Sequence, residues 1–384
     1  MRCASALSAH PVPAHAVGEV VGDIFERIDG RIDLAILFAS APHTGALEDI
    51  AGAVDDLLQP GALIGATTSS VIGGAQEVEA GPALSLWVAS FADPTCIRAM
   101  ALQANQTGSI ASVEGWDGTE AVGGQPSVMV LLADPFSFPA EAMFSEIERS
   151  RHQVGVIGGY ASAALGPGGN RLLFGRDVRD RGAVAVTIGG DEVPRLAVSQ
   201  ACRPVGTPFT VTHAERNMVY ELAGRPAYER LSALIDELSP EDRALAVRGS
   251  LHCGIVIDDR KLDFAPGDFI VRGVLGVDRS NGALAIGGDV PVGAAVQFQV
   301  RDADSAEGDL YRALGTDRAD GALVFSCTAR GTQLFDEPHR DASTIADVTG
   351  ARAIAGMACA GEFGAVGGRN FVHTQTASVA LFGS

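Results

Sequence analysis

The stretch Ile32–Ser40, with the sequence IDLAILFAS, is followed by GALEDIAGAVDDLL at Gly45–Leu58 and by ALIGATTSS at Ala62–Ser70. The first and third stretches are short apolar runs and predict buried strands, whereas the second has its apolar residues on one face of a helix. A glycine-rich connection then leads to another apolar run, ALSLWVASF at Ala83–Phe91. This order predicts a strand–helix–strand unit that closes with a hairpin and a last strand.

The same order of elements recurs twice further along the chain. Ile36 and Gly65 are separated by as many residues as Met129 and Gly158. Glycine pairs with one common spacing mark the turn segment of each copy: Gly65 and Gly73, Gly158 and Gly166, and Gly356 and Gly364. The predicted elements are the strand Ser127–Pro135, helix Pro139–Arg149 and turn Val154–Gly166 in the second copy, and the strand Ala322–Gly331, helix Asp341–Gly350, turn Ala353–Ala365 and last strand Phe371–Phe382 in the third. The sequence therefore predicts three versions of one unit.

A different pattern separates the second and third copies. An amphipathic helix is predicted at Pro226–Leu238, and consecutive strands follow between residues 251 and 302. Another amphipathic helix, at Ala16–Ile28, precedes the first copy. We therefore expect an N-terminal helix and lead-in at residues 1–30, a first domain at 31–209 and a second domain at 210–384.

The expected fold class is α/β of the mixed (α+β) kind, with two domains. Mixed, largely antiparallel sheets would carry helices on their outer faces, and two facing sheets would give helix–sheet–sheet–helix layers. A length of 384 residues with 47% hydrophobic content agrees with two cores rather than one.

The composition argues against several classes of protein. A net charge of −19 without a basic run makes nucleic acid and anionic membranes poor partners. Six cysteines without a CxxC pair indicate neither a disulfide framework nor a zinc ribbon. The N-terminus has no apolar core typical of a signal peptide, and no apolar run is long enough to span a membrane. We expect a cytoplasmic protein without membrane insertion, metal or cofactor.

Segments in both halves of the chain resemble a known family. The relevant segments are PAYERLSALIDEL (226–238), VGAAVQFQVRD (292–302), VFSCTARG (324–331), GEFG (361–364) and NFVHTQT (370–376). In this order they resemble the FIST C-terminal domain, and the strands of the first copy are similar to the FIST N-terminal domain. The resemblance implies a sensory protein of bacterial signalling that binds a small molecule, with amino acids or related metabolites as ligands. Because no kinase, methyl-accepting, cyclase or F-box segment is recognisable in the sequence, we expect a free-standing FIST protein, with a signalling protein in trans as a candidate partner.

Glu362 is the first candidate ligand-binding residue. In the repeat register it corresponds to Val71 and Ala164, so the unit itself does not need a carboxylate there. We interpret Glu362 as a copy-specific addition that accepts hydrogen bonds from a ligand amine or guanidinium. The alternative is a solvated turn residue.

The turn around Glu362 departs from the family pattern. The usual Gly-Glu-Ile-Gly-Pro is here Gly-Glu-Phe-Gly-Ala, so Gly361 and Gly364 are kept while Phe363 and Ala365 differ. A pocket shaped by this turn is expected to differ as well.

Arg330 follows Cys327 by three positions at the end of a predicted strand. We expect Arg330 to bind a carboxylate through two parallel hydrogen bonds. Together with Glu362, it would match the two charged ends of an amino acid. The alternative is an ion pair of Arg330 with Glu362 or Asp302.

Two cysteines and a histidine leave an enzyme as an open alternative. Cys327 or Cys359 would be the nucleophile, with His373 as base and Glu362 as the group that orients the base. Inert packing of both cysteines and a structural role for His373 are the simpler interpretations. These side chains also show no zinc-ligand spacing.

Thr67 and Thr68 lie beside glycines at the end of a predicted strand. Exposed backbone N–H groups at such a turn hold anions in other proteins, although hydroxyl groups there more often stabilise the turn itself. The segment has neither a P-loop lysine nor a dinucleotide fingerprint.

Three functions therefore remain open. A non-catalytic small-molecule-binding sensory protein is favoured, and an interaction scaffold in signalling or a cysteine-dependent enzyme are the alternatives. The residues expected to bind the ligand are Glu362, Arg330, Cys327, Gly361, Gly364, His373, Thr67 and Thr68.

Overall fold

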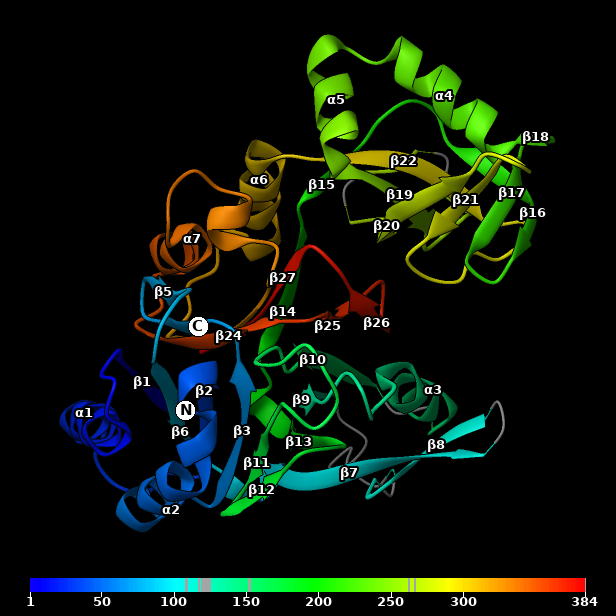
Figure 1. The fold of residues 1–384 in the computed structure, drawn as a ribbon. Helices are drawn as coiled ribbons and strands as arrows, with labels where there is room; N and C mark the ends of the chain where they lie inside the picture. The colour runs from blue at the N-terminus through cyan, green and yellow to red at the C-terminus, as the bar shows by residue number, and fades with distance from the viewer. Residues whose placement is uncertain are drawn as a thin grey trace. The chain divides into compact units, whose positions relative to one another are not determined.

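The computed structural model describes residues 1–383 apart from 108–109, 117, 119–125, 151–152, 262 and 266 (Figure 1). The chain forms two compact units. The first unit comprises Met1–Val198, Tyr311–Val372 and Thr376–Ser384, and the second comprises Ser199–Leu310 and His373–Gln375.

The predicted repeat is present three times in the first unit. In every copy, the first strand pairs in parallel with the second strand and antiparallel with the last one. The copies consist of β2 (Leu34–Ser40), α2 (Leu47–Leu58), β3 (Ala62–Thr68) and β6 (Leu84–Ser90); of β9 (Ser127–Ala133), α3 (Ala140–Ser150), β10 (Val154–Tyr160) and β13 (Ala183–Ile188); and of β23 (Gly321–Cys327), α7 (Arg340–Thr349), β24 (Ala353–Cys359) and β27 (Thr376–Phe382). Each copy thus forms the centre of its own sheet.

A short hairpin in every copy leaves that copy and joins the sheet of another. The hairpins are β4 (Val71–Gly73) with β5 (Gln76–Val78), β11 (Leu172–Phe174) with β12 (Asp177–Arg179), and β25 (Glu362–Val366) with β26 (Arg369–His373). β4 pairs with β24, β11 with β3, and β25 with β10, all antiparallel. The exchange is cyclic, so the three sheets of the first unit depend on one another.

Additional strands complete the edges of these sheets. They are β1 (Arg2–Ser8), β7 (Ile97–Thr107), β8 (Ile110–Glu114) and β14 (Arg195–Gln200). The resulting orders are β1-β6-β2-β3-β11-β12, β26-β25-β10-β9-β13-β7-β8 and β14-β27-β23-β24-β4-β5. The expected class, mixed α/β with largely antiparallel sheets, is confirmed, and three sheets rather than two facing ones surround the central core.

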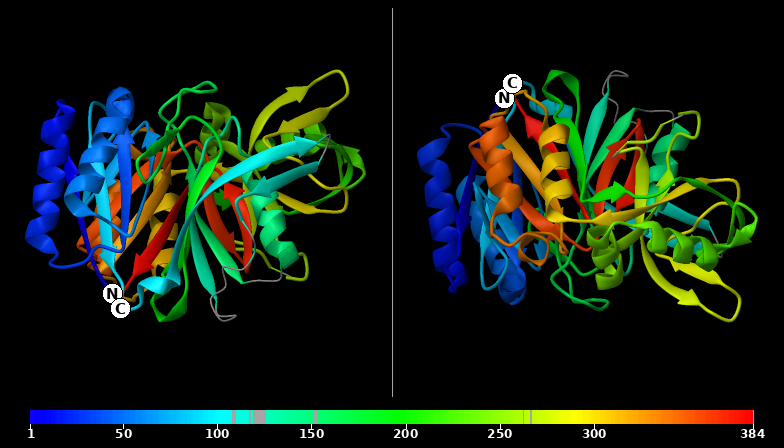
Figure 2. Two further views of the ribbon diagram at one scale, coloured as in Figure 1. Left: turned by 90° about the horizontal axis from the view of Figure 1, so that it is seen from below. Right: turned by 90° about the horizontal axis from the view of Figure 1, so that it is seen from above.

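Alternate residues of the central strands face two different apolar layers. Leu34, Ile36 and Phe38 of β2 belong to a core shared by all three sheets. The residues between them pack against α2 and against α1 (Pro13–Arg27). Figure 2 shows these two helices along the outer side of their sheet. Because both faces of the sheet are covered, the strands have continuous apolar sequences.

One glycine in the second strand of each copy has the same surroundings. A Cβ atom on Gly65, Gly158 or Gly356 would lie 2.3, 1.9 or 2.1 Å from the carbonyl oxygen of the residue paired with it on the first strand. Such contacts are far closer than a side chain tolerates, so only glycine fits. The same steric restriction at all three glycines confirms that these positions are equivalent in the three copies.

Beyond these glycines, the second copy does not follow the register expected from the sequence. Val71 and Glu362 begin their hairpins, but the corresponding first residue of the second hairpin is Leu172 rather than Ala164. A longer connection, residues 161–171, separates strand and hairpin there. The predicted last strand 371–382 is also two strands, because Gln375 has a φ of 67° and turns the chain between β26 and β27.

The second unit is built around a closed sheet. Its elements are β15 (Cys202–Pro204), β16 (Phe209–Glu215), β17 (Met218–Leu222), β18 (Arg225–Pro226), α4 (Ala227–Glu237), α5 (Pro240–Leu245), β19 (Leu251–Val256), β20 (Phe269–Asp278), β21 (Ala283–Ile286), β22 (Ala295–Arg301) and α6 (Ala303–Leu314), which continues into the first unit. The order β22-β16-β17-β21-β20-β19 closes because β19 pairs with β22. The strands predicted between residues 251 and 302 are therefore barrel strands.

Candidate functional site

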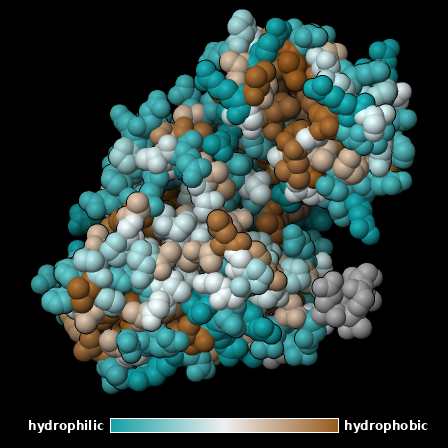
Figure 3. Space-filling model, viewed as in Figure 1, coloured by the Kyte–Doolittle hydropathy of each residue, from teal (hydrophilic) through white to brown (hydrophobic). Residues whose placement is uncertain are grey.

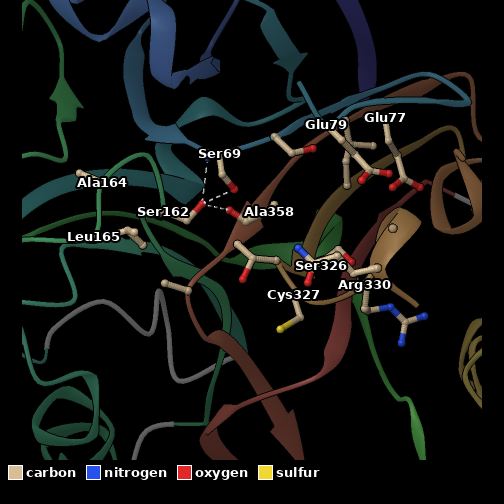
Figure 4. Close-up of a pocket in the computed structure, with 16 residues that line it drawn as sticks. Ser69, Glu77, Glu79, Ser162, Ala164, Leu165, Ser326, Cys327, Arg330 and Ala358 are labelled. Atoms are coloured by element: carbon tan, nitrogen blue, oxygen red, sulfur yellow. Dashed lines mark hydrogen bonds between the residues drawn. The ribbon is translucent and has the colours of Figure 1, made fainter. Parts of the chain in front are cut away.

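The carboxyl ends of β3, β10 and β24, one from each copy, meet in a cluster of polar groups. The Ser162 hydroxyl donates a hydrogen bond to the Ala358 carbonyl oxygen at 2.6 Å and accepts one from the Ser69 N–H at 3.0 Å (Figure 4). The Thr68 hydroxyl also donates to the Ala358 carbonyl oxygen, at 2.7 Å. These bonds tie the three copies together at one point.

A cavity of about 300 Å³ lies at this meeting point. Its lining residues are Ser69, Ser70, Ile72, Glu77, Glu79, Ser162, Ala164, Leu165, Ser326, Cys327, Thr328, Arg330, Gly331, Gln333, Ala358 and Ala360. All of them belong to the first unit, and they come from all three copies. Ligands of open α/β sheets commonly bind beyond the carboxyl ends of the strands, and a volume near 300 Å³ accommodates a small metabolite.

Two glutamates from the exchanged β4–β5 hairpin supply the carboxylates of the cavity wall. Glu77 is only 7% exposed, and its Oε1 accepts a hydrogen bond of 2.9 Å from the Ala342 N–H. Glu79 accepts a hydrogen bond of 3.0 Å from the Thr332 N–H. Burial, followed by the negative charges of Asp341 and Glu79, raises the pKa of the Glu77 carboxyl to about 7. This carboxyl therefore exchanges its proton near neutral pH.

Arg330 is buried and forms an ion pair with Asp341. Its Nε and Nη2 each donate a hydrogen bond of 2.7 Å to the Asp341 carboxylate, which also accepts one of 2.8 Å from the Ser326 hydroxyl. The Nη1 atom has no hydrogen-bond partner in the described part of the chain. The ion pair that the sequence predicts, with Glu362 or Asp302, is not formed, because Arg330 pairs with Asp341 and Asp302 binds Arg203. The two parallel hydrogen bonds expected for a ligand carboxylate are thus used within the protein.

Glu362 is fully buried at the start of β25, which excludes the solvated-turn interpretation. Its Oε2 accepts hydrogen bonds from the Thr376 N–H at 3.0 Å and the Thr376 hydroxyl at 2.8 Å. Oε1 has no hydrogen-bond partner of ordinary geometry among the described residues. An interaction with the Cys327 thiol nevertheless lowers the pKa of the carboxyl. Burial outweighs these contributions and raises the pKa of Glu362 to about 8. The carboxyl is therefore mostly protonated at neutral pH.

Glu362 does not belong to the lining of the cavity. Its equivalents in the other copies, Val71 and Leu172, are fully buried aliphatic residues. A carboxyl has therefore replaced an apolar side chain at a core position, behind the wall that carries Cys327 and Arg330.

The two candidate cysteines differ in their surroundings although they are paired across β23 and β24. Cys327 is partly exposed and lines the cavity. Cys359 is fully buried in the shared core, and burial raises the pKa of its thiol well above the usual value. Its sulfur would lie 2.4 Å from a Cβ atom placed on Gly159, so the two positions are packed closely. Cys359 is a packing residue.

The remaining predicted site residues lie outside the cavity lining. The Thr67 hydroxyl donates a hydrogen bond to the Arg171 carbonyl oxygen at 3.3 Å and accepts one from the Arg171 N–H at 2.8 Å. His373 is buried at the end of β26, in the segment that belongs to the second unit. Within the described ranges, no group of three or more potential metal-binding side chains is present. The other predicted residues that do not line the cavity are Thr68, Gly361 and Gly364.

Phe363, where the family pattern has isoleucine, does not shape the cavity. Its ring contacts Phe144 of α3 and Tyr160 at centroid distances of 5.7 and 4.8 Å. These residues belong to the apolar layer between the sheet and α3. The substitution therefore affects the packing of an outer helix.

Sequence alone does not place Ser162, Glu77 or Asp341 at the site. The Ser162 hydroxyl connects three copies. Asp341 occupies the apolar face of α7 together with Ala342 and Ile345. A charged residue on the buried face of a helix is the signal that would have indicated its ion pair.

Comparison with known proteins identifies the family of this fold. The FIST N domain matches residues 33–225, and the FIST C domain matches residues 227–365. The chain belongs to the FIST family, whose domains are associated with sensory signal transduction.

Two mycobacterial relatives match the whole chain. An uncharacterised protein of Mycobacterium tuberculosis is 37% identical over 389 residues, covering 100% of both chains. An uncharacterised protein of Mycobacterium bovis is 37% identical over 392 residues, covering 100% of this chain and 99% of the relative. The similarity thus extends over both domains. Among the helices of the described residues, none has the length and apolar character needed to cross a bilayer.

Proposed function

We propose that this FIST protein is a non-catalytic sensory protein that binds a small metabolite, an amino acid or a related compound, in the cavity at the carboxyl ends of β3, β10 and β24. The observation that carries the proposal is the composition of this cavity. Hydroxyl groups of Ser69 and Ser162, the Glu77 carboxyl and the partly exposed Cys327 surround a space of about 300 Å³. Convergent polar groups in a cavity of this size fix the orientation of a bound ligand.

The cavity is also placed where binding would act on the whole first unit. Its walls come from three copies whose sheets are joined by exchanged hairpins. A ligand that contacts all three copies stabilises one arrangement of them over others, which is what a sensory domain requires.

Thermal unfolding with a library of amino acids and related metabolites tests this function. A ligand at about 100 times its Kd adds about 2.7 kcal/mol of stability, which is a readily measured upward shift in Tm. Ala360→Trp, at an exposed residue of the cavity lining, should abolish the shift by filling the entrance. Ala14→Trp, at an exposed position of α1, is the matched control and should keep the shift. If no compound in the library raises the Tm, the proposal is wrong.

An interaction scaffold is the second candidate, and one surface feature favours it. Figure 3 shows an apolar area over α4 and α5 of the second unit. Val247, directly after α5, is 76% exposed, and Ile235 and Leu238 are only partly buried. Replacing Val247 by Asp should reduce retention of a signalling partner without lowering Tm. Unchanged retention by this variant would argue against a scaffold at this surface.

A further inference from the structure

The charges on the cavity wall do not balance. Arg330 is the basic residue among the lining residues, and its charge is paired with Asp341. Glu77 and Glu79, both on the wall, have no cation of their own among the described ion pairs. A cavity whose wall carries carboxylates without a cationic partner of their own favours a ligand that brings a positive charge.

We infer that the natural ligand of this cavity is an organic cation without a carboxylate, an amine or a guanidine, and that Glu77 is its principal counter-ion. The inference rests on the proposed function, because it names the class of ligand for the same site. It departs from the amino-acid class that the family resemblance implies.

Glu77 is the lining residue best placed to bind a cationic ligand. Its side chain is more than nine-tenths buried, with 7% exposure. Its Oε1 accepts a hydrogen bond from the Ala342 N–H. Oε2 has no hydrogen-bond donor in the part of the chain that the structure describes. Figure 4 shows the Glu77 and Glu79 carboxylates beside each other on one side of the cavity. An ammonium group with three donors would satisfy the free acceptor of Glu77 and reduce the repulsion between the two carboxylates.

The same wall offers a poor site for a ligand carboxylate. Asp341 already binds Nε and Nη2 of Arg330, so the planar pairing that carboxylates form with arginine is not available. Only Nη1 remains as a charged donor. A carboxylate in the cavity would also add a third negative charge beside Glu77 and Glu79, which disfavours its binding. A zwitterionic amino acid is therefore a weaker ligand than the amine derived from it.

Matched compounds that differ in one group test the inference. Isothermal titration in a buffer without amines should compare arginine with agmatine, leucine with isoamylamine, and phenylalanine with phenethylamine. Isoamyl alcohol serves as the neutral analogue of isoamylamine. We expect binding by at least one amine, with an affinity about tenfold or more above that of its amino acid and of the alcohol.

Variants of the protein test whether Glu77 is the residue that binds the amine. Glu77→Gln keeps the shape and removes the charge, so the Kd for the bound amine should rise by about tenfold or more. Glu48→Gln, at an exposed position of α2, is the control and should leave the Kd unchanged. If Glu77→Gln does not fold, Glu79→Gln provides the same test and should weaken amine binding as well.

The outcomes separate this inference from the proposed function. Tighter binding of an amino acid than of its amine, or binding of a neutral or anionic metabolite instead, would overturn the cationic ligand and leave the sensory function standing. An unchanged Kd in both glutamate variants would likewise overturn the role of the acidic wall. If no amine and no other metabolite binds, both the ligand class and the proposed function are wrong.

Discussion

Arg330 and Asp341 form a buried ion pair with two parallel hydrogen bonds of 2.7 Å, and both side chains are almost completely inaccessible to solvent. The pair connects the turn after β23 to the first turn of α7. It therefore fixes one wall of the cavity and leaves only the Nη1 atom of Arg330 without a hydrogen-bond partner in the described part of the chain.

Breaking this pair should destabilise the protein strongly. Asp341→Asn leaves a buried arginine without a counter-ion and should lower the free energy of unfolding by about 3–5 kcal/mol. Denaturation in urea measures the change. Asp55→Asn removes a partner of Arg176 in a surface pair and should change stability by about 1 kcal/mol or less. Equal effects of the two substitutions would contradict the buried pair.

The shared glycine of the repeat should not tolerate alanine. Gly158→Ala places a Cβ atom 1.9 Å from the Leu131 carbonyl oxygen, at a φ of 138°. We expect a loss of stability of about 3 kcal/mol or more, because both strain and a steric clash must be relieved. Gly52→Ala in α2 meets nothing within 4 Å and should stabilise the protein by about 0.5–1 kcal/mol. Thermal unfolding compares the two variants, and a neutral Gly158→Ala would refute the register of the copies.

Glu362 should make stability depend on pH. Its pKa is about 8 in the folded protein and near the ordinary value of 4.5 when unfolded, so the folded state binds the extra proton between these values. Stability therefore falls as pH rises through this window, by at most about 1.4 kcal/mol per pH unit from this group. Glu362→Gln should become more stable relative to the unaltered protein as pH increases from about 5 to about 8. A constant difference over this range would show that Glu362 is ionised in the folded state.

Neither Cys327 nor Cys359 should behave as a nucleophile. Cys359 is buried and should react with iodoacetamide only after unfolding. Cys327 is partly exposed and should react no faster than a cysteine in an unstructured peptide. Peptide mass mapping after brief labelling at neutral pH gives both rates. Selective rapid labelling of Cys327 would instead support the cysteine-dependent enzyme.

The sequence predicted the repeat because its signals are local. Apolar runs such as Leu34–Ser40, an amphipathic helix after each and glycines at a common spacing all act within one copy. The exchange of hairpins was not predictable in the same way. β4 begins at Val71 and pairs with Met357, and nothing in either segment specifies a partner so distant in the chain.

The same limit explains which residues of the candidate site were missed. Cys327 and Arg330 belong to one copy and were singled out from their own segment. Glu77 reaches the cavity only because its hairpin joins the sheet of another copy, and Ser162 only because three strand ends converge. Glu362 was expected to be specific to the third copy, and its burial at a position that holds Val71 in the first copy agrees with this.

A crystal structure of the protein with a bound metabolite from the thermal screen would locate the ligand site. We expect density for the ligand inside the cavity between Ser69, Ser162 and Glu77, with a ligand nitrogen within hydrogen-bond distance of the Glu77 carboxylate. If the ligand stabilises the protein but occupies another site, with this cavity empty, the cavity is not the binding site.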